Sequence, residues 1–179
     1  MNQYIMGAKA GVDNIVHQSC VLTRPLLVEI GSHCAIDGFL WCSTGLRIKD
    51  YVHIGPHVSI IGGQDSYLEM GNFSSLATGC RVICGTDNYQ GDGFQIPMVP
   101  KAYRGSTTIA PIIIENFVGV GANVVIMPGV KLAEGCVIAT GTCVRGDTEP
   151  WTIYAGDPLI PVKRRESSVI LAMAKEMGY

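Results

Sequence analysis

The stretch that decides the fold is IENFVGVGANVVIMPGVKLAEGCVIATGTCV, residues 114–144. A period of six fits neither the 3.6-residue turn of a helix nor the two-residue repeat of a simple strand. Two sets of mostly aliphatic residues here keep that period: Ile114, Val120, Ile126, Leu132, Ile138 and Val144, and two positions earlier Val118, Val124, Val130, Cys136 and Thr142. Gly, Asn and Pro recur between them and are typical of turns. The pattern predicts short strands alternating with tight corners, three strands to each turn of a solenoid.

The same repeat extends to both sides of this stretch. It begins at Ile30, slips by four positions across residues 62–69, and resumes at Met70. An insertion at one solvent-facing corner explains the slip, because the coils above and below keep their register. We therefore predict β-helix coils over residues 28–87 and 111–158. Residues 1–27 show no register and are expected to form an N-terminal cap, either a short helix or irregular.

Two further segments interrupt or follow the repeat. Residues 88–110 carry aromatic and charged side chains without any period, and so long a loop in a compact fold is usually functional. Its apolar members suggest that it packs on a neighbouring subunit. Residues 166–178 contain good helix formers and are expected to form a C-terminal helix lying against the end of the solenoid. The whole chain, residues 1–179, is then a single all-β domain with a protruding loop and one helix.

Composition limits the class of protein. Hydrophobic residues make up 47% of the chain and charged residues 16%, which argues against disorder and against a coiled coil. The formal net charge of −2 gives no general attraction to nucleic acid or to an anionic membrane. No signal peptide or membrane span is visible, so a cytoplasmic protein is expected. The seven cysteines form no CxxC pair and are interpreted mostly as buried apolar side chains in a reducing compartment.

The repeat resembles that of the hexapeptide-repeat acyltransferases, whose fold is a left-handed parallel β-helix and which include galactoside, maltose, xenobiotic and sugar acetyltransferases. The matching pieces are VGVGANVVIMPGV at 118–130, IATGTCV at 138–144, and AGDP at 155–158 followed by Lys163 and Arg164. The likeness covers roughly residues 28–165. It implies a homotrimer with active sites between subunits, acetyl-CoA as co-substrate, and no metal. The loop at 88–110 is similar to the family's loop that reaches across a subunit boundary.

The resemblance also implies cofactor-binding residues. Small residues let a cofactor approach the main chain closely, and charge-assisted bonds suit phosphates. Carried over by position, the pantetheine-binding and phosphate-binding residues are Gly121, Ala122, Ala139, Thr140, Gly141, Lys163 and Arg164. Without the resemblance, Lys163 and Arg164 would be read as part of a solvated charge run.

The chain departs from the family at the catalytic base. Sugar O-acetyltransferases of this type carry a Thr-His pair just before the protruding loop, whereas this sequence has Thr86 followed by Asp87. Either Asp87 accepts the proton, helped by a histidine from an earlier coil, or the acceptor is an amine. A neutral amine is a better nucleophile than a hydroxyl and needs only a positioned proton acceptor. This difference favours N-acetylation.

His57, which follows the Gly55–Pro56 corner, is the preferred histidine partner of Asp87, and His53 is the alternative. The two histidines also resemble the zinc ligands of the γ-type carbonic anhydrases, but no convincing third ligand is present. Polar residues of the inserted corner and of the loop are the candidates to hold a sugar or its nucleotide: Gln64, Asp65, Asn88, Tyr89, Tyr103 and Arg104.

Taken together, the sequence predicts an acetyl-CoA-dependent N-acetyltransferase acting on a nucleotide-linked amino sugar in polysaccharide or O-antigen-type biosynthesis. Saccharide O-acetylation and a noncatalytic hexapeptide scaffold are the alternatives, because fold does not fix function. The identity of the sugar, the nucleotide and the acyl chain stays open at this point.

Overall fold

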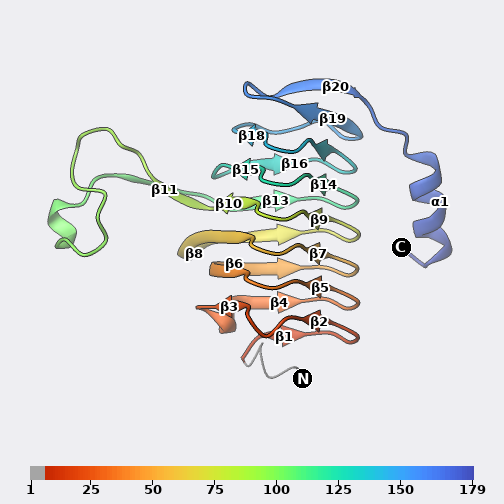
Figure 1. Ribbon diagram of the computed structural model, residues 1–179, viewed down its shortest axis with the longest axis horizontal. Helices are drawn as coiled ribbons and strands as arrows, with labels where there is room; N and C mark the ends of the chain where they lie inside the picture. Colours follow the sequence, from red (N-terminus) through yellow and green to blue (C-terminus); the bar gives the residue numbers. More distant parts are fainter. Residues whose placement is uncertain (1–6) are drawn as a thin grey trace.

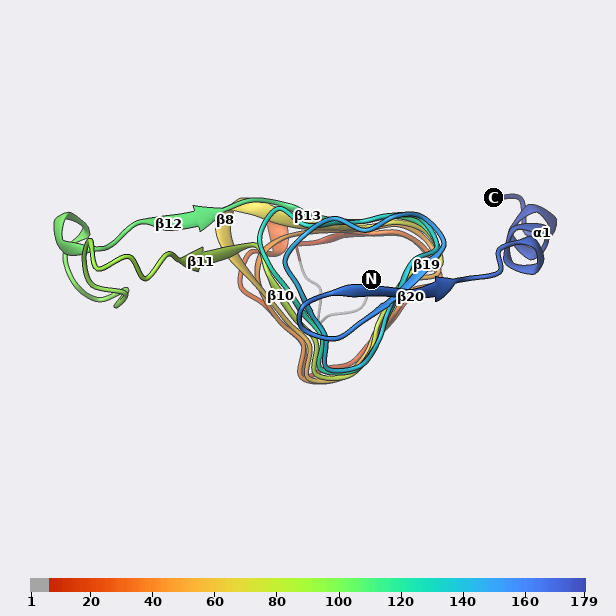
Figure 2. The same ribbon diagram turned by 90° about the horizontal axis from the view of Figure 1, so that it is seen from above.

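The computed structural model describes residues 7–179, and their strands wind into a parallel β-helix with a triangular cross-section (Figures 1 and 2). Each turn lays one strand on each of three faces, so that each face is a ladder of parallel strands from successive turns. The expected solenoid is confirmed. We call the corner between the first and second faces corner 1, between the second and third corner 2, and between the third and first corner 3.

The faces are built as follows. The first face contains β1 (Lys9–Ala10), β4 (Val28–Ile30), the ends of β6 (Trp41–Ile48) and β8 (Ser59–Met70), β13 (Ile112–Ile114) and β16 (Lys131–Leu132). The second contains β2 (Ile15–Val16), β5 (Ala35–Ile36), β7 (His53–Ile54), β9 (Ser75–Leu76), β14 (Gly119–Val120), β17 (Val137–Ile138) and β19 (Thr152–Ala155). The third contains β3 (Val21–Leu22), the beginnings of β6 and β8, β10 (Arg81–Ile83), β15 (Val125–Ile126) and β18 (Cys143–Val144).

The residues with period six fill the interior. Ile54, Ile60, Leu76, Ile126 and Ile138 are all fully buried, and each sits directly above or below its counterpart in the next coil. Burial of such aliphatic side chains is the main stabilising contribution to the fold. Five of the seven cysteines are also buried in this core, namely Cys34, Cys42, Cys80, Cys84 and Cys136. Burial raises the pKa of Cys42 to about 11 and that of Cys84 to about 12, so these thiols stay protonated.

The described part of the N-terminal segment differs from the expected irregular cap. Residues 9–22 form a complete coil, in which β1, β2 and β3 pair with β4, β5 and β6. Ala10, Val16 and Leu22 are six residues apart and keep the interior positions, a signal that was present in the sequence. A 3₁₀ turn, η2 (Pro25–Leu27), then adds residues at corner 3 and hides the continuity of the repeat. Residues 1–6 of the expected cap lie outside the described part.

The other two departures from the repeat lie at corner 3. The slip at residues 62–69 is an insertion there, because β8 runs across the corner and its pairing with β6 shifts between Cys42 and Gly45. One turn further on, β11 (Gly85–Asp87) and β12 (Thr107–Ile109) pair antiparallel and carry the loop away from the prism (Figure 2). We call residues 85–109 the arm; its tip includes the 3₁₀ turn η3 (Lys101–Tyr103).

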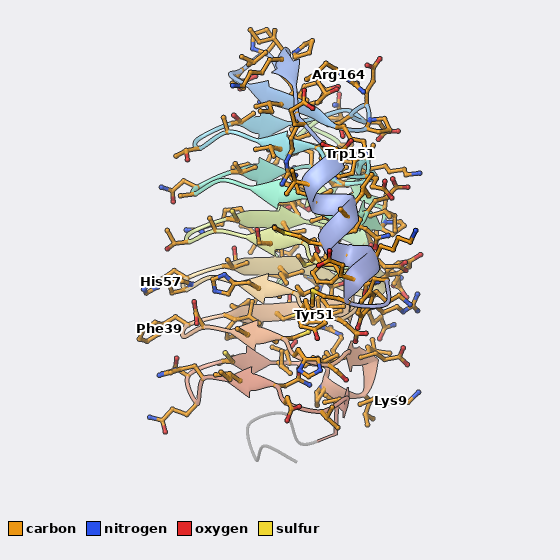
Figure 3. The ribbon with its side chains drawn as sticks, turned by 90° about the vertical axis from the view of Figure 1, so that its right-hand side faces the viewer. Lys9, Phe39, Tyr51, His57, Trp151 and Arg164 are labelled. Atoms are coloured by element: carbon orange, nitrogen blue, oxygen red, sulfur yellow. The ribbon has the colours of Figure 1, made fainter. Side chains whose placement is uncertain are left out.

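The C-terminal residues close the solenoid and then return along its side. β20 (Ile160–Arg164) pairs antiparallel with β19 on the last coil. The expected helix is present as α1 (Ser168–Glu176), but it lies along corner 1 rather than against the end of the solenoid (Figures 1 and 3). The reason is an aromatic ladder at that corner, in which Tyr51 stacks on Phe73 and Phe73 on Phe117. This ladder gives the apolar face of α1 a surface on which to pack. Neither α1 nor any other described segment is a helix long and apolar enough to cross a membrane.

Candidate functional site

Asp87 lies where two clefts of the arm meet. One cleft, about 260 Å³, is formed at the root of the arm by Gly62, Gly63 and β11–β12; the other, about 280 Å³, lies under the tip beside Phe94 and Arg104. The half-buried Asp87 side chain lines both. Its carboxylate has no hydrogen-bond or ion-pair partner anywhere in residues 7–179. A free carboxylate in a cleft is suited to hold an ammonium group or to receive a proton.

The polar side chains of the arm divide into those that brace it and those that are free. Asn88 is fully engaged across the arm, since its Nδ2 donates to Ser106 Oγ (3.1 Å) and its Oδ1 accepts from Thr108 Oγ1 (2.6 Å). Arg104 donates to two carbonyls of the tip, those of Pro97 and Val99. Asn88 and Arg104 therefore hold the arm in shape within this chain.

Tyr89 and Tyr103, the other loop residues expected to bind a sugar, are both exposed on the arm. Neither hydroxyl is engaged by another described side chain, so both stay available to a ligand or to a neighbouring subunit. Their role as substrate-binding residues stays a prediction.

The structure does not bring His57 to Asp87 within one chain, and the expected cluster of the two is wrong in that respect. His57 projects from corner 2, where its ring stacks on Phe39 with centroids 4.7 Å apart (Figure 3). Asp87 leaves from corner 3, with the third face between them. The coil equivalent of His57 is Gly79, whose N–H donates to the Pro56 carbonyl, and Asp87 follows Gly79 by eight residues. Counting in this way would have revealed the separation.

His53 is engaged differently. It lies on the second face, and its Nε2 is 2.9 Å from Asp37 Oδ2. The Asp37 carboxylate orients the His53 imidazole, an arrangement that is also found in histidine general bases. The pair lies on the second face, whereas the arm of the same chain leaves from corner 3. Among the described residues, no group of three His, Cys, Asp or Glu side chains has the arrangement of a metal site.

The residues expected to bind the pantetheine arm lie together at corner 2 in two successive coils, namely Gly121, Ala122, Ala139, Thr140 and Gly141. The N–H groups of Gly121, Ala139 and Gly141 all donate to carbonyls of adjacent coils at 2.8 Å. Those of Ala122 and Thr140 have no such partner in the described chain. A Cβ on Gly121 would come within 2.6 Å of the Thr140 nitrogen, so Gly121 is required by coil stacking itself. The free donors at this corner are therefore Ala122 and Thr140.

Corner 2 also changes its surface along the prism. In the lower coils it carries a stack of exposed rings, with His57 above Phe39. In the next three coils the equivalent left-handed position is occupied by Gly79, Asn123 and Gly141. The stack of rings therefore ends at His57. Gly79 is buried beneath the Asn123 side chain, whereas Gly141 is exposed and has open space on the side where a Cβ would lie. The sequence contains this step in the residue types of three coils, but only the observed register relates them.

Lys163 and Arg164 lie at the far end of β20 from this corner. Arg164 pairs with Thr152 near corner 1, whereas Ile160 pairs with Ala155 near corner 2. The separation along the strand is about 13 Å at roughly 3.3 Å per residue. Arg164 donates to Pro150 O and Thr152 Oγ1, and the exposed Lys163 side chain has no partner within residues 7–179. A ligand that touches both groups of predicted residues must therefore span at least about 13 Å.

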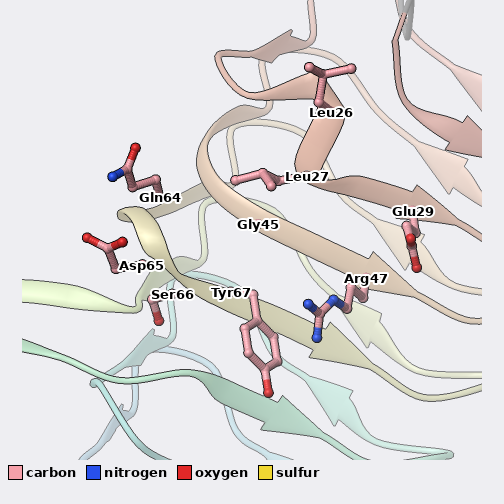
Figure 4. A pocket seen from close by; sticks show the side chains of 9 residues that line it. All are labelled: Leu26, Leu27, Glu29, Gly45, Arg47, Gln64, Asp65, Ser66 and Tyr67. Atoms are coloured by element: carbon pink, nitrogen blue, oxygen red, sulfur yellow. The ribbon is translucent and has the colours of Figure 1, made fainter.

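Gln64 and Asp65 line a third cavity on the outer side of corner 3, between β6 and β8 (Figure 4). Arg47 and Tyr67 complete its wall and were not expected from the sequence. They come together only because β8 pairs with β6 across the insertion, placing Arg47 opposite Glu69 and Gly45 opposite Tyr67. An outward-facing arginine beside a polar insertion was the available signal.

No family model matches the chain. A probable macrolide acetyltransferase of Lysinibacillus sphaericus is 33% identical to it over 134 residues, which cover 66% of this chain and 70% of that protein. The chain belongs to the hexapeptide-repeat acyltransferases. Its resemblance to the family and its assignment as an enzyme are thereby confirmed, and the scaffold alternative loses its support.

Two other relatives of this hexapeptide-repeat acyltransferase have informative names. A dTDP-4-amino-4,6-dideoxy-D-glucose acyltransferase of Escherichia coli is 29% identical over 147 residues, 80% of this chain and 74% of that one. A variant of AntD, an N-acyltransferase from Bacillus cereus solved with dTDP-4-amino-4,6-dideoxyglucose and coenzyme A, superimposes with a TM-score of 0.90 over 97% of this chain and 92% of its own. At 24% identity, the AntD likeness shows the shared fold.

Proposed function

We propose that this hexapeptide-repeat acyltransferase is an acetyl-CoA-dependent N-acetyltransferase that acts on a nucleotide-linked amino sugar, in the synthesis of a polysaccharide such as an O-antigen. The observation that carries the proposal is the free carboxylate of Asp87 on an arm without a histidine. All four histidines precede the arm in the chain, at positions 17, 33, 53 and 57. An amine needs an acceptor for its proton, and a carboxylate attracts its ammonium form. Relatives named for amino-sugar substrates support the same acceptor class.

The chain's own groups divide the reaction between them. Acetyl-CoA supplies the thioester carbonyl that the amine attacks, and coenzyme A is the leaving group. Asp87 holds the amine and receives its proton. The free N–H groups of Ala122 and Thr140 are the proposed support for the developing oxyanion, because the N–H groups of Gly121 and Gly141 are already used in coil stacking. The exposed backbone at Gly141 fits a pantetheine arm, and Lys163 offers a free cation to a phosphate.

The arm and the corner 2 residues leave different corners of one chain, so the proposal places the active site between subunits of a homotrimer. Phe94, Ile96, Met98 and Tyr103 are large apolar side chains exposed on the arm, and a neighbouring subunit would cover them. In that arrangement the arm of one subunit presents Asp87 to corner 2 of the next, where His57 would stand beside the transferred group. The free cysteines suit a cytoplasmic location.

The test is a thiol-release assay with acetyl-CoA and a panel of UDP- and dTDP-linked amino sugars. Each amino sugar is matched with the nucleotide sugar that carries a hydroxyl in place of the amine. We expect release of coenzyme A with at least one amino sugar and none with its hydroxyl counterpart. Turnover of the hydroxyl compounds alone would establish O-acetylation instead, and Asp87→Asn and His57→Asn should then each abolish it.

A further inference from the structure

The bend of β8 at corner 3 encloses a polar cavity of about 290 Å³ that the proposed chemistry does not use (Figure 4). Arg47 and Tyr67 project from its right side in this view, and Gln64 and Asp65 lie at its left end. The cavity thus has the Arg47 guanidinium and the Glu29 carboxylate at one end, and a carboxylate and an amide at the other. A ligand that fits it carries negative charge at one end and hydroxyl or N–H groups at the other.

Arg47 lies between Glu29 and Glu69 of the neighbouring strands but forms no ion pair with either. Its guanidinium stacks over the Tyr67 ring, 4.2 Å from the centroid, which orients the group and leaves its N–H edge free. No described side chain accepts a hydrogen bond from it. The Glu29 carboxylate of the same cavity is already paired with Lys9, whose Nζ is 3.0 Å from Glu29 Oε1. The positive charge of Arg47 is therefore available to an anion, and a planar guanidinium binds phosphate oxygens in pairs.

Ser66 also borders the cavity, but its Oγ is buried in the chain and has no hydrogen-bond partner in residues 7–179. The polar side chains that a ligand can touch are therefore those of Arg47, Tyr67, Gln64 and Asp65.

Consecutive residues of one strand line the arm cleft and the cavity. Gly62 and Gly63 of β8 line the cleft that holds Asp87, and the next residues, Gln64 to Tyr67, line the cavity. From Gly63 to Tyr67 the strand spans about 13 Å at roughly 3.3 Å per residue. A ligand that places an amine at Asp87 would therefore run along the bend towards Arg47.

We propose that this cavity binds the sugar-phosphate part of the acceptor, with Arg47 on the phosphate and Gln64 and Asp65 on the sugar hydroxyls. The inference rests on the proposed function and deepens it, because it makes Arg47 the residue that selects phosphorylated amino sugars over free ones. Amide and carboxylate side chains can both bind hydroxyl groups, and Gln64 and Asp65 supply one of each at this end of the cavity.

The experiment compares Arg47→Ala with Lys49→Ala. Lys49 is an exposed cation two residues further along the chain, so its loss removes the same charge from the same side of the molecule. Lys49 does not line the cavity, which makes Lys49→Ala the matched control. For the nucleotide-linked amino sugar, Arg47→Ala should raise KM about tenfold or more, and Lys49→Ala should not. The KM for acetyl-CoA and the slow turnover of the free amino sugar should stay within about twofold of wild type in both variants.

Equal effects of the two variants would overturn the assignment of Arg47. So would an Arg47→Ala variant that loses free and phosphorylated acceptors alike, because that result indicates a role in folding alone. If the wild-type enzyme acetylates no amino sugar, the proposed function fails, and the cavity is tested by calorimetry with dTDP. Weaker dTDP binding in Arg47→Ala but not in Lys49→Ala supports the cavity assignment, and unchanged binding contradicts it.

Discussion

At the scale of the residue, the proposed chemistry depends on the Asp87 carboxylate and its protonation. With Asp87→Asn, we predict that kcat/KM for the amino sugar falls about 10²-fold, within the usual range for loss of a general base. The residual rate should increase with pH, because more of the amine is then neutral without help from the enzyme. The measurement is the pH profile of kcat/KM.

Asp92→Asn is the matched control for this variant, because it removes the same charge from the same arm. Asp92 Oδ2 accepts the N–H of Ser106 at 2.9 Å, and an asparagine oxygen can still accept that bond. A loss of activity in Asp92→Asn equal to that in Asp87→Asn would mean that the arm's charge, rather than the Asp87 carboxylate, is what matters.

Single residues also show which features of the structure could be predicted from the sequence. Ile60, Leu76 and Ile126 were correctly placed in the core, because the period of six fixes which side chains point inward. Arg47 was missed, because its contact with Tyr67 depends on the pairing of β6 and β8 across an insertion. Interior positions follow from local periodicity, whereas a cavity at a corner follows from how neighbouring coils differ in length.

At the scale of the element, the corners carry both stability and the proposed cofactor contacts. A Cβ at Gly121 would lie 2.6 Å from the Thr140 nitrogen, and one at Gly71 would lie 2.6 Å from the Asn116 nitrogen. We predict that Gly121→Ala and Gly71→Ala each destabilise the fold by about 1–3 kcal/mol through this overpacking, measured by urea unfolding. Only Gly121→Ala, at corner 2, should also raise the KM for acetyl-CoA. An equal rise in Gly71→Ala, at corner 1, would show that general loosening of the coils is responsible.

The contact of α1 with corner 1 gives a prediction with a defined pH dependence. The Tyr179 hydroxyl donates to Asp50 Oδ2 at 2.7 Å, and this bond raises the pKa of Tyr179 to about 12. The Ser32 N–H and then Tyr179 lower the pKa of Asp50. The stabilisation that comes from the raised pKa of Tyr179 is complete below about pH 10, the ordinary pKa of tyrosine. It is lost as pH rises through about 12. The stabilisation that comes from the lowered pKa of Asp50 is complete above about pH 4, the ordinary pKa of aspartate. It is lost as pH falls through the lowered pKa of Asp50.

Tyr179→Phe keeps the edge-on ring contacts with Tyr51 and Phe73 and removes only the hydroxyl. We predict that backbone amides of residues 168–176 exchange with solvent about tenfold faster at pH 7 in this variant, whereas the core of the solenoid is unaffected. Acidification from pH 7 to about pH 2 should increase amide exchange in α1 more in the wild type than in the variant, after correction for intrinsic exchange rates. Unchanged exchange at pH 7 would show that the ring contacts alone hold the helix.

At the scale of the whole molecule, the main discrepancy between the sequence prediction and the structure is that one chain does not bring Asp87 and His57 together. The repeat correctly predicted a solenoid, an arm and a C-terminal helix. It did not show that Asp87 and His57 leave from different corners, because that depends on counting residues across an insertion. The same separation is the reason why we propose that a second subunit completes the site, with its corner 2 approaching the arm that this chain extends.

Assembly is therefore the property that joins the fold to the proposed activity, and the arm tip is where it can be tested. Met98 lies on the arm and is 89% exposed. Figure 2 shows that the arm extends away from the prism. We predict that the wild-type protein has three times the chain mass of 19.2 kDa by light scattering at micromolar concentration. Met98→Asp should shift it towards the monomer, because a charge cannot be buried unpaired in an apolar interface, and activity should fall in parallel.

Val12→Asp is the control for a charge placed on an exposed apolar position of the first coil, away from the arm. It should leave both mass and activity unchanged. If the Met98→Asp protein becomes monomeric and keeps full activity, the site is complete within one chain and the intersubunit arrangement is wrong. If activity and mass fall together and both recover at higher protein concentration, as mass action requires, the arm of one subunit completes the site of another.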